Sequence, residues 1–388
     1  MATLIKHKKV ELTELFYDLV YVYGISKMTS LIHHIHHGGL SWSNFLAFAV
    51  GMIIMINSWM IQTVFTNRFG KNSLTNIAFM FAQMSLFQMS LLLISLTSVT
   101  GNYGSRESFI YFYLPFTLIS LVLLGQYALE YYRSTDLVDR SLIKRFFYIL
   151  GLRSLGLLIS LFLPLNLGLT VAVISVLGTW ILPGLITGRR TQVADEAANL
   201  TSFPHLAERL SLLVIITFGE AIIGIADYFS AGHLSPLSFL VFTVIASLFM
   251  VYIVEIDYML DIETDDKEVN ALIYWHYPIF FGISFLNVSL AYLANQEVEN
   301  SFAVLMAYLG VFLVTLGIFG CQRFNKESHK FTSHLALGMF LPILFGFAAS
   351  WLVLGQSQLL IAILFLVTLV MSIVFIRFNL SRLADTNS

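Results

Sequence analysis

The chain has 388 residues, of which 57% are hydrophobic and only 11% are charged. Soluble domains carry about 25% charged residues, so this composition argues against an ordinary soluble enzyme and predicts a polytopic membrane protein. The net charge of −2 provides no basic surface for nucleic acid, and the single cysteine, Cys321, can form neither an internal disulfide nor a cysteine-rich metal site.

Apolar segments long enough to cross a bilayer follow one another along the whole chain. A span needs about 20 apolar residues, and the polar breaks leave twelve candidates. In chain order they are residues 13–33, 44–65, 73–99, 108–132, 142–163, 167–187, 206–229, 237–260, 269–295, 301–321, 333–354 and 357–378. Acidic residues interrupt the first segment where a signal peptide would need an apolar core, so no cleaved signal peptide is expected.

Lysines and arginines are distributed unevenly between the loops on the two sides of these spans. Of the 21 lysines and arginines, all but four fall in loops on one side. The exceptions are Arg106 on the other side and Lys27, Arg153 and Arg209 within spans. Because cytoplasmic loops carry the excess of positive charge, the distribution predicts an even number of spans with both termini in the cytoplasm.

The chain also matches itself at an offset of 194 residues, which places Glu14 on Glu208 together with other polar pairs. This match predicts an all-α membrane protein made of two six-helix repeats, residues 1–194 and 195–388. Repeats with an even number of spans run parallel to each other. Parallel repeats occur in transporters that bind substrate between the halves.

Charged groups in the first predicted span need partners or water, because each costs at least about 2.5–3.5 kcal/mol in the hydrocarbon region. Glu14 and Asp18 lie one turn apart on the same helical face. Glu14 could instead be a solvated residue at the cytoplasmic interface. Asp18 lies deeper and requires a partner.

A run of histidines follows the first span, formed by His33, His34, His36 and His37. Four imidazoles could hold Zn²⁺ or Cu²⁺ or sense external pH. Since no carboxylate or cysteine accompanies them, an incidental interfacial run is favoured, and no metal or cofactor is expected.

In the fifth span, Arg153 lies about halfway along the helix. An unpaired guanidinium is costly there, so Arg153 is expected to meet a carboxylate such as Glu220 or an anionic substrate.

The seventh span is the richest in charge. At 100° per residue, one stripe holds His205, Arg209, Glu220 and Asp227, and Glu208 lies beside it. A cation at the inner end with carboxylates further out is typical of a proton or cation path. Alternatively these groups form buried salt bridges, with Arg209 pairing Asp18 or Glu14.

Two further polar features follow. Glu255 and Asp257 begin an acidic run that continues to Asp266 and is expected to be a solvated loop. In the ninth span, His276 precedes Pro278 by two residues. This histidine could relay protons near neutral pH, or it could be a hydrogen-bonded packing element.

Three segments carry a resemblance to the bacterial low temperature requirement A (LtrA) family. They are ELFYDLVYV (14–22), HLAERLSLLVIITFGE (205–220) and HYPIFFGI (276–283). The family pattern usually continues the Glu-Arg pair with His-Gly, whereas Leu210 and Ser211 follow here. The resemblance implies a multi-span protein of the bacterial plasma membrane linked to growth in the cold. It marks as family positions Glu14, Asp18, Glu208, Arg209, Glu220 and His276.

These patterns favour a secondary transporter or an ion- or proton-conducting protein for an unidentified small solute or ion, embedded among membrane lipids. The predicted path residues are Glu14, Asp18, Arg153, His205, Glu208, Arg209, Glu220 and His276. A membrane-embedded lipid-handling enzyme is one alternative, although no catalytic cluster or nucleotide-binding motif appears. A structural or sensory membrane protein is the other, and the sequence predicts no oligomeric state.

Overall fold

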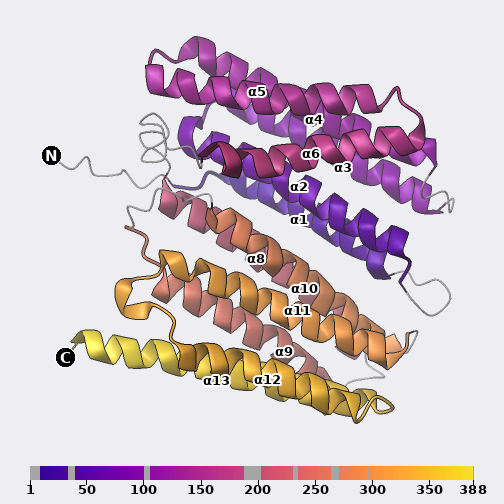
Figure 1. Ribbon diagram of the computed structural model, residues 1–388, viewed down its shortest axis with the longest axis vertical. Coiled ribbons are helices and arrows are strands. Elements are labelled where there is room, and N and C mark those ends of the chain that lie inside the picture. Colours follow the sequence, from indigo (N-terminus) through magenta and orange to yellow (C-terminus); the bar gives the residue numbers. More distant parts are fainter. Residues whose placement is uncertain are drawn as a thin grey trace. The chain divides into compact units, whose positions relative to one another are not determined.

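Helices form the structure, as the apolar runs predict. The computed structural model describes residues 9–33, 40–99, 105–187, 202–229, 235–263, 271–295 and 298–387. Within these ranges the α-helices are α1 (Leu12–His33), α2 (Trp42–Phe69), α3 (Leu74–Val99), α4 (Arg106–Arg133), α5 (Leu137–Ser160), α6 (Leu165–Thr187), α8 (Phe203–Gly224), α9 (Pro236–Ile253), α10 (Ala271–Asn295), α11 (Asn300–Cys321), α12 (Ser333–Trp351) and α13 (Ser357–Asn387) (Figure 1). Each overlaps one predicted span, so the all-helical class is confirmed.

Several helix starts follow from local sequence, because a side-chain oxygen caps a backbone N–H that would otherwise lack a partner. Ser105 accepts from the Ser108 N–H at the start of α4. Thr332 accepts from the Leu335 N–H at the start of α12. These polar residues end the loops and fix where the apolar helices begin.

Eight of the described helices are long and apolar enough to cross a membrane by length and composition: α2, α3, α4, α9, α10, α11, α12 and α13. α1, α5 and α8 carry charged residues within their length. The described apolar part of α6 is shorter, Leu165–Ile181. The protein is therefore a multi-pass membrane protein, and the number of twelve spans, the cytoplasmic termini and the duplication stay predictions.

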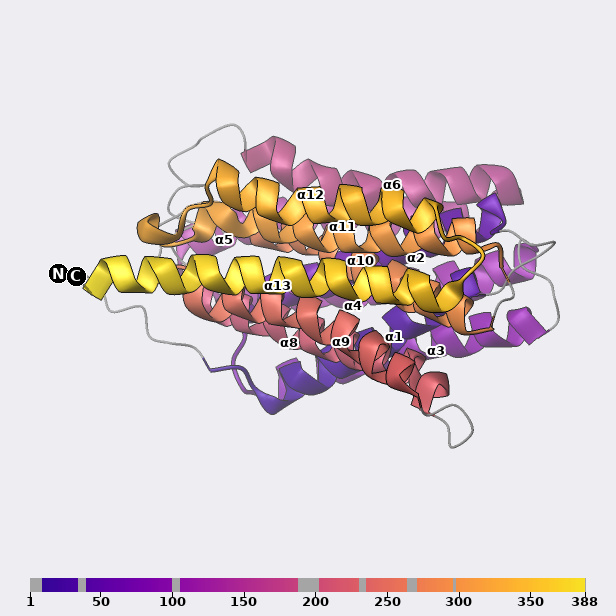
Figure 2. The ribbon, with the colours of Figure 1, turned by 90° about the horizontal axis from the view of Figure 1, so that it is seen from below.

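The chain divides into two compact units. The first comprises Met1–Lys27 with Ala49–Arg209, and the second comprises Met28–Phe48 with Leu210–Ser388. In the first unit, α3 packs against α4, α4 against α5 and α5 against α6. In the second unit, α12 packs beside α13 and α10 beside α11 (Figures 1 and 2).

Glycines allow α10 and α11 to approach backbone to backbone in the second unit. A Cβ atom at Gly282 would lie 2.6 Å from the Gly310 carbonyl oxygen, and one at Gly310 would lie 2.7 Å from the Gly282 oxygen. Small residues permit this close packing in membrane helices. Gly282 lies in the third signature segment, and this contact indicates a packing role for it.

Short irregular helices complete the second unit: η1 (Ala226–Phe229), η3 (Gln322–Phe324) and η4 (Glu327–His329) are 3₁₀ turns, and η2 (Val254–Met259) is a π-helix that continues α9. The Leu260 N–H donates to the Glu255 carbonyl five residues earlier, at 3.0 Å. This wider turn changes the direction in which the side chains of η2 point.

Candidate functional site

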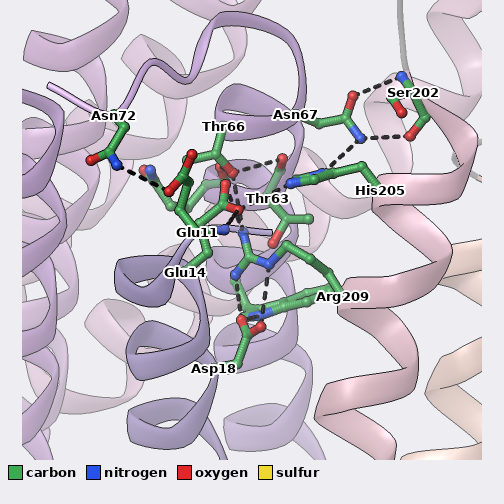
Figure 3. Close-up of polar contacts among 12 residues, drawn as sticks. Glu11, Glu14, Asp18, Thr63, Thr66, Asn67, Asn72, Ser202, His205 and Arg209 are labelled. Atoms are coloured by element: carbon green, nitrogen blue, oxygen red, sulfur yellow. Dashed lines mark hydrogen bonds and ion pairs between the residues drawn. The ribbon is translucent and has the colours of Figure 1, made fainter. Parts of the chain in front are cut away.

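Four titratable side chains from α1 and α8 meet inside the first unit (Figure 3). Glu14 and Asp18 lie one turn apart on α1, and His205 and Arg209 lie one turn apart on α8. All four are buried, with exposed fractions between 0% and 3%. The two one-turn spacings seen in the sequence therefore place two pairs of side chains against each other.

Two charged contacts join the helices. The Arg209 guanidinium donates to both carboxylate oxygens of Asp18, with its Nε 3.2 Å from Oδ2 and its Nη2 directed at Oδ1. Arg209 Nη1 lies 3.9 Å from Glu14 Oε1, and His205 Nε2 lies 3.0 Å from Glu14 Oε2. The pairing of Arg209 with Asp18 and Glu14, one of the two alternatives left by the sequence, is confirmed.

Helix α2 supplies the neutral half of the site. The Trp59 indole Nε1 donates to Asp18 Oδ1 at 2.6 Å, and the Arg209 Cζ lies 5.4 Å from the Trp59 ring centroid. Arg209 Nη1 also donates to the Thr66 hydroxyl at 3.1 Å, which in turn donates to the Gln62 carbonyl. Asp18 and Arg209 are thus held by hydrogen bonds as well as by charge, as buried ion pairs require.

Asn67 determines where the His205 imidazole carries its proton. The Ser202 backbone N–H donates to Asn67 Oδ1 at 2.9 Å, and Asn67 Nδ2 donates to the Ser202 carbonyl at 2.8 Å. These bonds fix the orientation of the carboxamide. Its Nδ2 lies 3.3 Å from His205 Nδ1, which must accept because an amide nitrogen only donates. The ring proton is then on Nε2, which donates to Glu14.

The formal charges of this cluster do not balance. Glu14 and Asp18 each contribute −1, Arg209 contributes +1, and the imidazole in this tautomer is neutral. The four buried side chains carry a net charge of −1, counted from the contacts above. One cation, a proton included, neutralises the cluster.

A small pocket open to the surface reaches this cluster at Glu14. Its lining residues come from the start of α1, the end of α2 and the start of α3, and they are Glu11, Thr13, Glu14, Thr66, Gly70, Lys71, Asn72, Asn76, Ile77 and Met80. Asn72 Nδ2 donates to Glu11 Oε2 at 3.0 Å, and the Glu11 N–H donates to Glu14 Oε2 at 3.1 Å. Glu14 therefore belongs both to the pocket and to the buried cluster.

Buried neutral polar residues along α2 were not among the predicted site residues. They are Asn57, Ser58, Gln62, Thr63, Thr66 and Asn67. From Asn57 to Asn67 the helix rises by about 15 Å at 1.5 Å per residue. Ser58, Gln62 and Thr66 recur every fourth position, a helical-face pattern that the charge-based search of the sequence overlooked.

Arg153 joins this α2 stripe. Its Nη1 donates to Asn57 Oδ1 at 2.8 Å and its Nη2 donates to the Ser58 hydroxyl at 2.7 Å. The side chain is fully buried, as its mid-helix position predicts. The guanidinium is therefore hydrogen-bonded to neutral amide and hydroxyl groups.

Gln83 on α3 connects the stripe to α1. Its Nε2 donates to Gln62 Oε1 at 2.9 Å and to Gln126 Oε1 at 3.3 Å, and its Oε1 accepts from the Tyr17 hydroxyl at 3.0 Å. The polar interior of the first unit therefore extends beyond the charged cluster.

Besides Arg153, three predicted site residues lie outside the charged cluster. Glu208 is exposed on α8. Glu220 belongs to the second unit, where its Oε1 accepts from Asn287 Nδ2 at 3.3 Å. His276 also belongs to the second unit and is fully buried.

Both ring nitrogens of His276 have partners. Its Nδ1 donates to the Leu272 carbonyl at 2.7 Å, and the Tyr252 hydroxyl donates to its Nε2 at 3.0 Å. This geometry corresponds to the hydrogen-bonded packing element, the second of the two alternatives given for His276.

Two expectations from the sequence are wrong. Asp227 does not continue the α8 stripe, because α8 ends at Gly224 and Asp227 lies exposed in the 3₁₀ turn η1. Glu255 is not solvated but 0% exposed, because it lies in the π-helix on the inner face of the second unit. Asp257, two residues later, is exposed as expected.

The histidine run lies only in part within the described residues. His33 is described and half-buried, whereas His34, His36 and His37 lie outside the described residues. Among the residues that the structure describes, no group of three or more histidine, cysteine, aspartate or glutamate side chains is placed to hold a metal ion.

Comparison with known proteins identifies one family. The model of the family described as bacterial low temperature requirement A protein (LtrA) matches residues 9–374. The match covers α1 to the greater part of α13, and so includes every residue of the cluster. Among curated proteins, none is similar enough to count as a relative.

Proposed function

The chain belongs to the bacterial low temperature requirement A family, and we propose that it is a secondary transporter or ion-conducting protein in which the cluster of α1, α2 and α8 binds one proton. The single observation that carries the proposal is a buried cluster of net charge −1 that is reached by a pocket at Glu14. A purely structural network would be expected to balance its own charges.

The energetics support binding of a cation. An uncompensated charge in the interior costs several kcal/mol even after relaxation, on the order of the effective penalties for buried ions. A proton on Glu14 would neutralise the cluster and remove this cost. Intramembrane carboxylates with such neighbours mark ion and proton pathways in membrane proteins.

The two carboxylates take different roles in this proposal. Asp18 is clamped by Arg209 and Trp59 and keeps its charge. Glu14 accepts from His205 and from the Glu11 backbone N–H, and lines the pocket. Glu14 therefore exchanges the proton, and the Asp18–Arg209 ion pair holds α1 and α8 together beside it.

The α2 stripe provides a continuation of the path. Hydroxyl and amide groups follow one another over about 15 Å of helix, from Asn67 to Asn57, and Arg153 lies at the far end. Such groups stabilise water or a hydrated ion inside a bundle that is otherwise apolar. If the proton is a coupling ion, the transported solute is a small molecule.

Proton flux into proteoliposomes tests the proposal. Purified full-length protein is reconstituted with an internal pH-sensitive dye, and a K⁺ gradient with valinomycin supplies the driving force. We expect flux in the wild type, loss of flux in Glu14→Gln, and wild-type flux in the matched control Glu208→Gln, which changes an exposed carboxyl on α8. Equal flux in wild type and Glu14→Gln would refute the role of the cluster.

One observation favours a second candidate, a structural membrane protein whose buried charges only fix helix packing. The Asp18 carboxylate accepts three hydrogen bonds, two from Arg209 and one from Trp59, as a rigid structural pair would. Under this alternative Glu14→Gln loses stability but no flux exists in the wild type. The same liposome experiment therefore separates the two candidates.

We further propose that the protein acts in the bacterial cytoplasmic membrane and supports growth in the cold, as the family name suggests. Deletion of the gene should slow growth at low temperature. Wild type and Glu208→Gln should restore it, and Glu14→Gln should not. Full rescue by Glu14→Gln would separate cold growth from proton binding.

A further inference from the structure

A second buried carboxyl lies in the other unit, and the proton path described above does not use it. Glu255 is 0% exposed, and neither of its carboxylate oxygens has a hydrogen-bond partner among the described residues. Among the described residues, no lysine, arginine or histidine nitrogen forms an ion pair with the Glu255 carboxylate, that is, lies within 4.0 Å of it. An ionised carboxylate in this position would be strongly destabilised.

Backbone pairing brings one neutral partner to Glu255. Leu260 and Asn325 form an antiparallel bridge, the Asp261 N–H donates to the Phe324 carbonyl at 2.8 Å, and the Lys326 N–H donates to the Met259 carbonyl at 2.9 Å. This pairing anchors the segment after α11 against the end of η2. It places the Asn325 carboxamide next to the Glu255 carboxyl.

The Asn325 side chain is in the same condition as Glu255. It is 4% exposed, and its Nδ2 and Oδ1 atoms both lack a partner within hydrogen-bond distance among the described residues. A protonated carboxyl and a carboxamide are complementary, because the acid O–H can donate to Oδ1 while Nδ2 donates to the acid carbonyl. An ionised carboxylate could use only the Nδ2 donor.

We propose that Glu255 and Asn325 form a second proton-binding site, in which Glu255 carries the proton as a neutral acid facing the Asn325 carboxamide. The π-helix is part of the site, because its wide turn sets the direction of Glu255, and such turns recur at functional positions in membrane and soluble helices. This site lies in the second unit and shares no residue with the Glu14 cluster, so the two sites are tested separately.

The titratable groups around the site do not supply a counter-charge. Tyr252 precedes Glu255 by almost one turn and donates its hydroxyl to His276, and Cys321 is a buried thiol at the end of α11. Asp257 is exposed on the same helix. On the paired segment, Arg323 and Lys326 are exposed, and Lys326 Nζ donates to the Tyr258 carbonyl at 3.0 Å. Helix α13 packs against η2 and carries Arg377 and Arg382. Among the ion pairs of the described residues, neither arginine pairs with Glu255.

Infrared spectroscopy of the purified full-length protein tests the proposal directly. A protonated carboxylic acid absorbs above the amide I band and shifts downward in D₂O, whereas a carboxylate does not absorb there. We expect this band in the wild type at neutral pH, its loss in Glu255→Gln, and its retention in the matched control Asp257→Asn, which alters an exposed carboxyl on the same helix. Asn325→Leu should shift the band, because it removes the carboxamide that faces the acid.

Two results would overturn the assignment. One is a band that persists in the double variant Glu14→Gln/Glu255→Gln, because the acid would then be neither of these carboxyls. The other is a carboxylate signal at neutral pH that appears only with Na⁺, because the site would then hold a metal cation and no proton.

Thermal unfolding provides a readout that does not depend on the infrared band. A group that binds a proton in the folded state and releases it on unfolding stabilises the protein less as the pH rises. The melting temperature of the wild type should therefore fall relative to that of Glu255→Gln as the pH rises from about 4.3, the usual glutamate value, through neutral. Parallel pH profiles for the two proteins would contradict a proton on Glu255.

Discussion

The charge balance of the α1–α8 cluster predicts an unusual order of stability among its variants. Asp18→Asn takes the net charge of the cluster from −1 to 0, whereas Arg209→Met takes it from −1 to −2, counted from the same contacts. Removing one partner of a buried pair costs about 3–5 kcal/mol because the other charge is left uncompensated. In Asp18→Asn, Glu14 still lies 3.9 Å from the guanidinium and can take over the pairing.

We therefore expect Asp18→Asn to lower the free energy of unfolding by about 3 kcal/mol, at the low end of that range, and Arg209→Met by about 5 kcal/mol. The double variant should lose about 0.5–3 kcal/mol less than the sum, as expected for residues in contact. Reversible denaturation in detergent micelles, followed by tryptophan fluorescence or circular dichroism, provides the measurement. Equal losses in the two single variants, or strict additivity, would refute the charge count.

Three other variants test separate parts of the structure. Gly282→Ala places a Cβ 2.6 Å from the Gly310 oxygen and should cost about 1–3 kcal/mol in the same denaturation assay, whereas Gly151→Ala, with nothing within 4 Å, should not destabilise. Asn67→Leu leaves the Ser202 N–H, the Ser202 carbonyl and His205 Nδ1 without this partner, and should lower the free energy of unfolding by about 1–3 kcal/mol. A loss below about 0.5 kcal/mol, the scatter of surface substitutions, would contradict the anchoring role of Asn67. Burial and two neighbouring cations lower the pKa of His329, so the folded state resists its protonation, and the wild type should lose melting temperature relative to His329→Gln as the pH falls below about 6.5, the usual histidine value. A pH-independent difference between those two proteins would count against this effect.

Much of the helical framework could be predicted from the sequence because apolar runs and polar breaks determine helices in a chain of this composition. The predicted end of the eighth span at residue 260 agrees with η2, which ends at Met259. Glu255 was misassigned because the acidic run after it is visible in the sequence, whereas the pairing of residues 259–261 with 324–326 is a tertiary contact. No local pattern indicates that contact.

The charged half of the cluster was also predictable in part. Buried charges need partners, and this requirement alone led from Arg209 to Asp18 and Glu14. Asn67 was not predictable in the same way, because a neutral amide in an apolar helix has no obligatory charged partner. Its role depends on the backbone of Ser202, which lies 135 residues later in the chain.

The protonation state of the His205 ring is the most direct test of the central claim that the cluster carries one uncompensated negative charge. Nitrogen NMR of the ¹⁵N-histidine-labelled full-length protein, with His205→Gln for assignment, reports the state of both ring nitrogens at neutral pH. We expect a neutral ring with its proton on Nε2 and an unprotonated Nδ1 facing Asn67. A ring protonated on both nitrogens would contradict this claim, because the proton that neutralises the cluster would then lie on His205 and not on Glu14.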